Sequence, residues 1–366
     1  MKSKSMFTTF RHRFTPLVVA ATLFSGLLAL GCRAQGVAAL RDDLRKTLIG
    51  SHATAILNAQ KTSEMTVGEV IQERVRFTSE PGQDVFVLVH RPKAEGRYPA
   101  VIVQHFLGGT KDYPAFSFLY QTMAQRGFVV VAIDGRFRGE RQNGTSLEAA
   151  MIAALKGGKG NPFLYDTAFD LIRLIDYLQT RPDVDPEKIG MTGFSEGGIL
   201  TWLTSAADER IRVAVPIIGV TNFGETLSNA DLPNAQLRIK LFEPVFKEYA
   251  KDLGENEINS KVLKSAWNRL VPGMLDRFDA ANVIPQIAPR PLLILSHELD
   301  ELFPIEGAKQ VYNRVRSRYQ EVNAVDRVDF RIAPGLTHAP TNVFQLLAEV
   351  NAMLDWMDRW LKRPAA

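Results

Sequence analysis

Residues 188–207 read "KIGMTGFSEGGILTWLTSAA". A short apolar run ends at Phe194, Ser195 follows with a glycine two residues to either side, and a helix-like segment begins at Glu196. In the nucleophile elbow G-x-S-x-G, a sharp turn between a strand and a helix presents the serine hydroxyl, and glycine is needed where a side chain would clash. The stretch therefore predicts a strand, a tight turn and a helix, with Ser195 as a candidate nucleophile rather than an ordinary turn serine.

The same alternation of apolar strand-like runs and helix-like segments continues along the chain. The expected strands are residues 84–90, 98–106, 128–134, 188–194, 211–219, 290–296 and 326–334, and the expected helices are residues 116–127, 165–181, 196–207, 306–319 and 343–363. Repeated strand-helix-strand units predict an α/β fold: a doubly wound, mostly parallel sheet with helices on both faces.

Two segments depart from this alternation. Residues 221 to about 283 contain helix-like patches and no convincing strand, which predicts a helical cap inserted over the carboxyl ends of the strands. Residues 36–75 read as a helical leader packed on the domain. The expected organisation is one domain over residues 35–366 that carries the cap insertion.

The N-terminus has the pattern of a secretory signal peptide over residues 1–34. A basic start is followed by 14 uncharged, mostly apolar residues and then by small residues around "GCRAQG", and the apolar run is too short for a membrane-spanning helix. Two processing routes stay open: cleavage after Ala34, or cleavage before Cys32 within "LALGC", which would leave a lipidated cysteine as a membrane anchor. The protein is therefore expected to be exported, whether periplasmic, extracellular or anchored at the cell envelope.

Charge and composition narrow the class of protein further. The 366 residues are 46% hydrophobic and 23% charged, which is typical of a globular chain. The formal charge of +4 resides in residues 1–31, whose four Lys and Arg residues have no acidic counterpart, so the rest of the chain is neutral. This excludes a basic nucleic-acid surface. Cys32 is the only cysteine, so no internal disulfide can form.

A serine nucleophile needs a base, and the base needs a carboxylate. His338 stands in "APGLTHAPT", a loop after the last expected strand, and Asp300 stands in "LLILSHELDELFP", directly after another strand. The order Ser195, Asp300, His338 is that of α/β-hydrolase triads. Glu298 and Glu301 are expected to be solvated loop charges. His297 beside these carboxylates could suggest a metal site, but it offers no i, i+4 histidine pair or cysteine ligand, so no metal is expected.

An oxyanion needs two preorganised N–H donors. The backbone of Glu196, at the start of the helix after the serine, is one candidate. The other lies in "HFLGGTKD", residues 105–112, where Gly108 and Gly109 allow the backbone to approach a substrate closely. His105 is then expected to be a structural residue at the strand end.

With these motifs in view, the chain resembles the α/β-hydrolase superfamily, in particular its dienelactone hydrolase, acetyl xylan esterase and prolyl-oligopeptidase-like branch. The similarity covers about residues 70–362 and is carried by "VIVQHFLGGTK", "VVAIDGRFRGER", "MTGFSEGG", "RPLLILSHELDELFP" and "GLTH". It implies Ser195 as nucleophile, Asp300 as acid, His338 as base and the Leu107 and Glu196 amides as oxyanion donors, with no cofactor. Phe106 stands where the family's H-G-x-G-G pattern has its first glycine.

This constellation predicts an exported serine hydrolase that cleaves carboxylic esters through an acyl-enzyme, with small-molecule or oligosaccharide esters as substrates and deacylation of carbohydrates as the use that suits the resemblance. Within "GRFRGER", Arg138 and Arg141 are weak candidates for holding a substrate carboxylate, against structural ion pairs as the alternative. A serine peptidase and a non-catalytic surface lipoprotein remain as alternative functions, although residues 36–75 are too few for the β-propeller of the related oligopeptidases.

Overall fold

The computed structural model describes residues 38–50, 52–339 and 343–362. The expected signal peptide, including Cys32 and both cleavage sites, lies outside the described residues. No helix in the described ranges has the length and apolar character needed to cross a bilayer.

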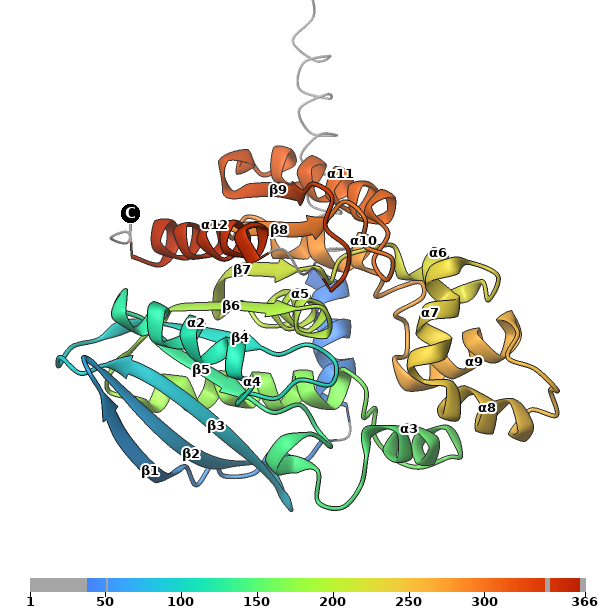
Figure 1. Cartoon of the computed structure of the whole chain (residues 1–366), viewed down its shortest axis with the longest axis horizontal. Helices are drawn as coiled ribbons and strands as arrows, with labels where there is room; N and C mark the ends of the chain where they lie inside the picture. Colours follow the sequence, from blue (N-terminus) through green and yellow to red (C-terminus); the bar gives the residue numbers. More distant parts are fainter. Residues whose placement is uncertain (1–37, 51, 340–342, 363–366) are drawn as a thin grey trace, which may run out of the picture.

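A nine-stranded sheet forms the centre of the molecule, in the order β1-β2-β3-β5-β4-β6-β7-β8-β9 (Figure 1). The strands are β1 (Gln60–Val67), β2 (Val70–Glu80), β3 (Gln83–Pro92), β4 (Tyr98–Gln104), β5 (Val129–Ile133), β6 (Val184–Phe194), β7 (Ile211–Ile217), β8 (Leu292–His297) and β9 (Val328–Ala333). The strands from β5 to β9 in this order run parallel, and β1, β2 and β3 add an antiparallel edge. The predicted mostly parallel α/β sheet is confirmed.

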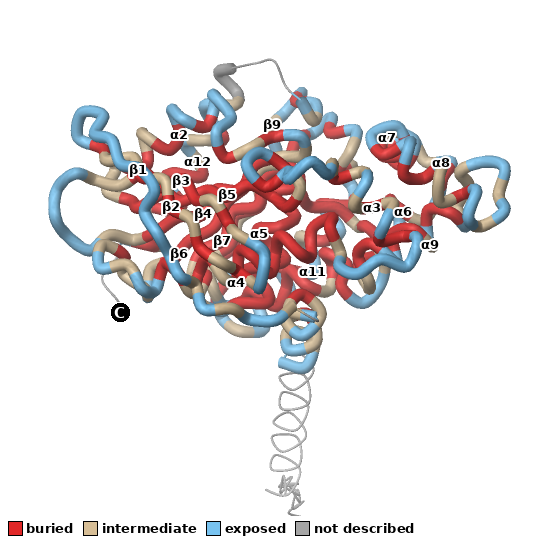
Figure 2. Tube along the Cα trace, turned by 90° about the horizontal axis from the view of Figure 1, so that it is seen from below, coloured by how far each residue is buried: buried red, intermediate tan, exposed pale blue. Residues whose placement is uncertain are grey.

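Helices cover both faces of the sheet, and the side chains of each strand alternate between the two resulting cores. The helices outside the insertion are residues 38–49, α2 (Pro114–Gln125), η1 (Gly139–Arg141), α3 (Leu147–Leu155), α4 (Tyr165–Thr180), α5 (Glu196–Ala207), α11 (Ile305–Glu321), η3 (Val325–Arg327) and α12 (Val343–Leu361). On β4, Val101 and Val103 pack under α2 and α12, whereas Ala100 and Ile102 pack on the side of α4, α5 and α11. This period of two buries the parallel strands on both faces, as Figure 2 shows in red.

The segment between β7 and β8 consists of short helices. These are α6 (Phe223–Ser228), α7 (Pro233–Leu241), α8 (Glu243–Asp252), α9 (Ser260–Leu270), α10 (Ala280–Val283) and η2 (Ile284–Ile287). Helices α6 to α9 stand beside the sheet next to α3, on the side where the parallel strands end (Figure 1). An aromatic cluster of Phe242, Phe246 and Trp267 with Phe163 holds them to the segment before α4. We refer to residues 221–283 as the helical insertion.

The expectation of a helical leader over residues 36–75 is wrong for its second half. Only residues 38–49 are helical, and the chain then forms β1 and continues into β2. The residues of β2 alternate between buried and more exposed positions, a strand pattern that the helical interpretation overlooked. β1 is exposed throughout, so its strand conformation comes from backbone pairing with β2 and has no hydrophobic signal in the sequence.

The loop after β5 is fixed to the fold by a buried carboxylate. Asp170 on α4 is fully buried and accepts hydrogen bonds from Arg136 Nε at 2.9 Å and from Arg141 Nη1 at 2.7 Å. Burial alone raises the pKa of Asp170, but the two guanidinium groups outweigh it and hold the pKa at about 2. The carboxylate is therefore charged at neutral pH.

We expect Asp170→Asn to lower the free energy of unfolding by about 3 kcal/mol, because it leaves the buried Arg141 without an ion-pair partner among the described residues. Arg136 also loses one carboxylate but keeps its pair with Glu80. Urea denaturation of the two proteins measures the difference. Asp176→Asn on the same helix is the matched control, since Asp176 pairs with Arg173 and Arg210 near the surface and its loss costs about 1 kcal/mol or less. Equal losses in the two variants would contradict this account.

Candidate active site

Ser195 occupies the turn between β6 and α5 in a strained backbone conformation. Its φ is +56° and its ψ is −112°, a region that costs a non-glycine residue about 1–3 kcal/mol. A Cβ on Gly197 would overlap the carbonyl oxygen of Gln104 at the end of β4, and one on Gly193 would overlap the Gly197 carbonyl. The two glycines thus let helix α5 pack directly against the end of β4, as the nucleophile elbow requires.

The side chains of Ser195, His338 and Asp300 form one hydrogen-bonded chain. Ser195 Oγ lies 2.9 Å from His338 Nε2, and His338 Nδ1 lies 3.0 Å from Asp300 Oδ2. Ser195 and Asp300 are buried, and the His338 side chain is 15% exposed. With the Asp300 carboxylate accepting from Nδ1–H, Nε2 is left free to accept the serine proton.

The loop after β8 holds Asp300 in this position. Its Oδ1 accepts the backbone N–H groups of Leu302 at 2.9 Å and of Phe303 at 2.8 Å. The Phe303 ring stacks on the His338 ring with centroids 5.4 Å apart and an interplanar angle of 26°. One short loop therefore orients both the carboxylate and the imidazole.

Glu298 and Glu301 are exposed loop carboxylates, as expected, but each also accepts a backbone hydrogen bond that the sequence did not indicate. Glu301 Oε2 accepts the backbone N–H of His338 at 3.0 Å, and Glu298 Oε2 accepts that of Gly335 at 2.8 Å. Both carboxylates are on the exposed side of the loop, yet they bind the segment that carries the histidine. The sequence showed the charges but not the distant backbone that they bind.

The two backbone amides expected to bind an oxyanion have no acceptor within the part of the chain that the structure describes. They belong to Leu107, after β4, and to Glu196, the first residue of α5. Unpaired amides at the start of a helix attract an anion because the helix dipole adds to their partial charges. Both residues therefore have donors to offer, although Phe106 replaces the glycine of the family pattern.

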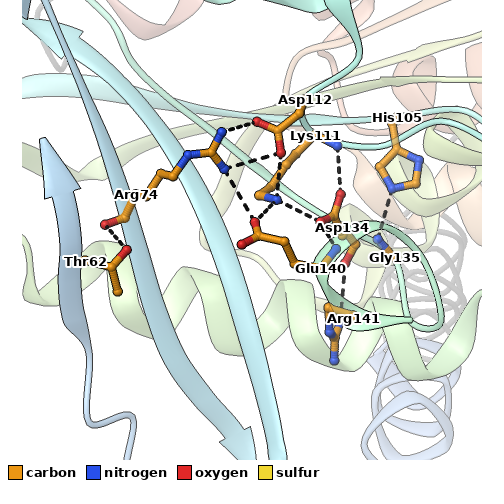
Figure 3. Close-up of polar contacts among 9 residues, drawn as sticks. All are labelled: Thr62, Arg74, His105, Lys111, Asp112, Asp134, Gly135, Glu140 and Arg141. Atoms are coloured by element: carbon orange, nitrogen blue, oxygen red, sulfur yellow. Dashed lines mark hydrogen bonds and ion pairs between the residues drawn. The ribbon is translucent and has the colours of Figure 1, made fainter. Parts of the chain in front are cut away.

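The loop that carries Leu107 is anchored by polar contacts that sequence analysis missed (Figure 3). Lys111 is almost completely buried, and its backbone N–H and its Nζ donate to the two oxygens of Asp134 after β5, at 2.9 and 2.8 Å. His105 Nε2 accepts the N–H of Gly135 at 2.9 Å, so Nδ1 carries the proton and donates to the Phe106 carbonyl at 2.8 Å. A charged pair of this kind between two strand ends leaves no local sequence pattern.

Burial lowers the pKa of His105, and the positive charge of Arg138 lowers it further. A neutral imidazole is what its two hydrogen bonds require, because Nε2 must accept while Nδ1 donates. The expected structural role of His105 at the strand end agrees with these contacts.

The arginines considered for substrate binding have carboxylate partners inside the protein. Arg141 is buried against Asp170, away from the cleft beside the loop after β4. Arg138 does line that cleft, but its Nη1 donates to Glu196 Oε1 at 2.8 Å. The contacts of Arg138 and Arg141 are thus those of structural ion pairs, the alternative that the sequence left open.

The cleft has a volume of about 510 Å³ and lies between the loop after β4 and the helical insertion. Its walls include Leu107, Gly108, Arg138 and Leu147, together with Leu241 and Phe242 at the junction of α7 and α8. A larger hollow of about 660 Å³ lies between β2, β3 and the end of α4 and includes none of the residues described above. The smaller cleft is lined by Leu107, one of the two residues with a free amide, and not by the side chains of the hydrogen-bonded chain. Because of Leu107 we assign the substrate region to this cleft.

His297, at the end of β8, braces the loop that carries His338. It is buried, its Nδ1 donates to the Thr337 carbonyl at 2.6 Å, and its Nε2 lies 2.9 Å from Glu349 Oε2 on α12. Burial alone lowers the pKa of His297, but the hydrogen bond to Glu349 and its charge outweigh burial and raise it. In the described residues, no group of three or more His, Cys, Asp or Glu side chains is arranged to hold a metal ion.

A strand-turn-helix elbow, a serine-histidine-carboxylate chain and two free amides at the carboxyl edge of this sheet are the elements of acyl transfer. The sheet order and the elbow define the class: the protein has the α/β-hydrolase fold. The comparisons then give the family. The sequence profile of the prolyl oligopeptidase family matches residues 114–364, so the chain belongs to that family and is a hydrolase.

Individual relatives agree with this assignment. YtaP of Bacillus subtilis, provisionally named a hydrolase, is 27% identical over 252 residues, which cover 64% of this chain and 71% of YtaP. Acetyl xylan esterase 1 from a Thermoanaerobacterium species superposes with a TM-score of 0.61 at 22% identity, over 86% of this chain and 93% of that one. The glucuronoyl esterase from Solibacter usitatus superposes with a TM-score of 0.57 at 15% identity, over 87% and 91% of the two chains.

The ion pair of His297 predicts a pH-dependent contribution to stability. Because the pKa of His297 is raised on folding, this contribution is complete below the unfolded-state value of about 6.5 and is lost as the pH rises through the folded-state value. We therefore expect the difference in melting temperature between the wild type and Glu349→Gln to be largest near pH 6 and to shrink by pH 9. Thermal denaturation across this range measures it, and a difference that does not vary with pH would contradict the assignment.

Proposed function

We propose that the protein is an exported serine hydrolase that cleaves carboxylic esters through an acyl-enzyme intermediate. The observation that carries the proposal is the hydrogen-bonded chain from Ser195 Oγ through the His338 ring to Asp300, at 2.9 and 3.0 Å. In this proposal Ser195 is the nucleophile, His338 the general base and acid, and Asp300 the group that fixes the histidine tautomer.

Acylation begins when Ser195 Oγ attacks the ester carbonyl and passes its proton to His338 Nε2. The negative charge that develops on the carbonyl oxygen is stabilised by the N–H groups of Leu107 and Glu196, which have no other acceptor among the described residues. Asp300 stabilises the imidazolium that forms. His338 then donates its proton to the departing alkoxide, which leaves as an alcohol, and the acyl group stays on Ser195.

Deacylation repeats these steps with water in place of the serine hydroxyl. His338 Nε2 takes a proton from the water, the resulting hydroxide attacks the acyl carbonyl, and the same two amides receive the charge. The collapse of this intermediate returns the proton from His338 to Ser195 Oγ and releases a carboxylic acid. Both half-reactions need no group beyond the side chains and amides named here.

For the substrate, we propose small-molecule or oligosaccharide esters, with acylated carbohydrates as the leading class. Two solved structures with this fold are named acetyl xylan esterase and glucuronoyl esterase, and these names support the proposed class. The cleft of about 510 Å³ is large enough for a compound of that size and is polar on the side of Arg138 and Gln142.

Export remains part of this proposal, with residues 1–34 as the signal peptide and Cys32 as the residue that would carry a lipid. A mature protein that begins at Gln35 would support cleavage after Ala34. A membrane-bound form that becomes soluble in Cys32→Ser would support lipid anchoring, and an intact-mass measurement on each fraction separates the two. A full-length cytoplasmic product that retains residues 1–34 would contradict export.

We expect Ser195→Ala to lower kcat/KM for 4-nitrophenyl acetate by at least about 10³-fold, because the nucleophile is lost while the fold is kept. A fluorophosphonate probe should label the wild type and not the variant. Ser317→Ala is the matched control, since Ser317 is an exposed serine on α11, and its labelling should be unchanged.

Other outcomes separate the alternatives. A wild type that neither reacts with the probe nor hydrolyses the ester would indicate a non-catalytic member of the family. Turnover of a peptide anilide at a higher kcat/KM than any ester in the panel would favour a peptidase. Labelling that persists in Ser195→Ala would place the nucleophile elsewhere.

A further inference from the structure

Arg238, on helix α7 of the insertion, is a buried guanidinium without a carboxylate partner. It is 8% exposed and makes no ion pair with any described carboxylate, although the charge of Asp300 acts on it from a greater distance. Every Asp and Glu of the chain falls within the described ranges, so no acidic side chain elsewhere could supply one. The other arginines near the strand ends, Arg136, Arg138 and Arg141, all have such partners.

The contacts of Arg238 do not compensate for its burial. Nη2 donates to the Leu302 carbonyl at 2.7 Å, and the guanidinium carbon lies 4.5 Å from the Phe303 ring centroid and 5.9 Å from that of Phe223. Among the described residues, Nε is buried without a partner, and Nη1 has no hydrogen-bond acceptor. By contrast Arg290, which makes no ion pair with a described carboxylate, donates to four backbone carbonyls.

The charge on Arg238 persists in this environment. Burial lowers the pKa of Arg238 to about 10, against a smaller opposing effect of the Asp300 charge, so the group is still a cation at neutral pH. A buried cation is costly unless a counter-charge or several hydrogen bonds replace its hydration shell. Among the described residues, the guanidinium group of Arg238 has one carbonyl acceptor and two aromatic faces beside it, and its Nη1 has no hydrogen-bond acceptor.

The position of this cation connects it to the candidate active site. It binds the carbonyl of Leu302 and lies over the ring of Phe303, the two residues whose amides bind Asp300. The same Phe303 ring stacks on His338. A single aromatic side chain thus contacts both the unpaired guanidinium and the imidazole that bonds to Ser195.

We propose that Arg238 forms a binding site for a carboxylate carried by the substrate, so that the preferred substrates are anionic esters. The inference deepens the proposed ester hydrolysis and rests on it. A guanidinium with free N–H groups binds a carboxylate through short, charge-assisted hydrogen bonds, and here the bound anion would also neutralise the buried cation. Arg238 in the helical insertion, and not Arg138 or Arg141, is thus proposed to bind the substrate carboxylate, because the charges of Arg138 and Arg141 are already paired.

The test compares esters that differ only by a carboxylate. Mono-4-nitrophenyl glutarate against 4-nitrophenyl pentanoate places the charge on the acyl side, and 4-acetoxybenzoate against 4-methylphenyl acetate places it on the alcohol side. We expect kcat/KM of the wild type to favour the anionic member of at least one pair by tenfold or more. Arg238→Met should abolish this preference, mainly by raising KM for the anionic esters. Any effect through the loop that holds Asp300 would lower kcat for both members of a pair alike and would leave the preference as it was.

Two further variants complete the design. Arg238→Lys keeps the charge without the planar fork and should retain part of the preference. Lys240→Met removes an exposed positive charge from the same helix and should leave the preference unchanged. Should Arg238→Met fail to fold, competitive inhibition by free glutarate in the wild type and its weakening in Arg238→Lys carry the test.

The possible results distinguish a failure of the proposed carboxylate site from a failure of the proposed ester hydrolysis. Hydrolysis of the neutral esters without any preference for anionic ones, and without inhibition by glutarate, would overturn the carboxylate site and leave the esterase in place. An equal loss of activity on neutral and anionic esters in Arg238→Met would also overturn it and assign Arg238 to positioning the Asp300 loop. No hydrolysis of any ester by the wild type would instead be a failure of the proposed function.

Discussion

The close packing of helix α5 on the end of β4 is the constraint on which the rest of the site depends. Gly193 and Gly197 have no room for a side chain because the backbone of Gln104 and its neighbours fills the space. Ser195 is consequently held at a φ of +56° at the turn, with the start of α5 beside the loop that follows β4. This close packing thus fixes the conformation of Ser195 and brings Glu196 and Leu107 to the same edge of the sheet.

Around this elbow, loops at the carboxyl edge are fixed by buried charges rather than by apolar packing. Lys111 and Asp134 join the loops after β4 and β5, Asp170 holds the arginines of the second loop, and His297 binds both α12 and the segment before His338. In each of these contacts a buried charge lies next to at least one charge of the opposite sign. Arg238 is an exception, because it makes no ion pair with a described carboxylate and only its Nη2 donates a hydrogen bond. For this reason we propose that it binds a ligand.

The prediction from sequence was most successful where local pattern and chain order agree. The apolar runs indicated the parallel strands. The positions of Ser195, Asp300 and His338 after β6, β8 and β9 indicated three side chains that the fold brings into hydrogen-bond contact. Edge strand β1 was missed because its residues are all exposed, so its conformation depends on pairing with β2. The partners of Glu298 and Glu301 were missed because they are backbone amides about forty positions away.

The sequence by itself therefore determined the fold class, the elbow and the residues able to perform acyl transfer, because these follow from periodicity, glycine placement and the order of strand ends. Only the tertiary structure decided which charges are free. Arg138 and Arg141 looked available in the sequence and are paired, whereas Arg238, within the helical insertion, is buried and makes no ion pair with any described carboxylate. The physical reason is that a charge is neutralised by whatever the fold brings within a few ångströms of it, and sequence distance carries no information about that.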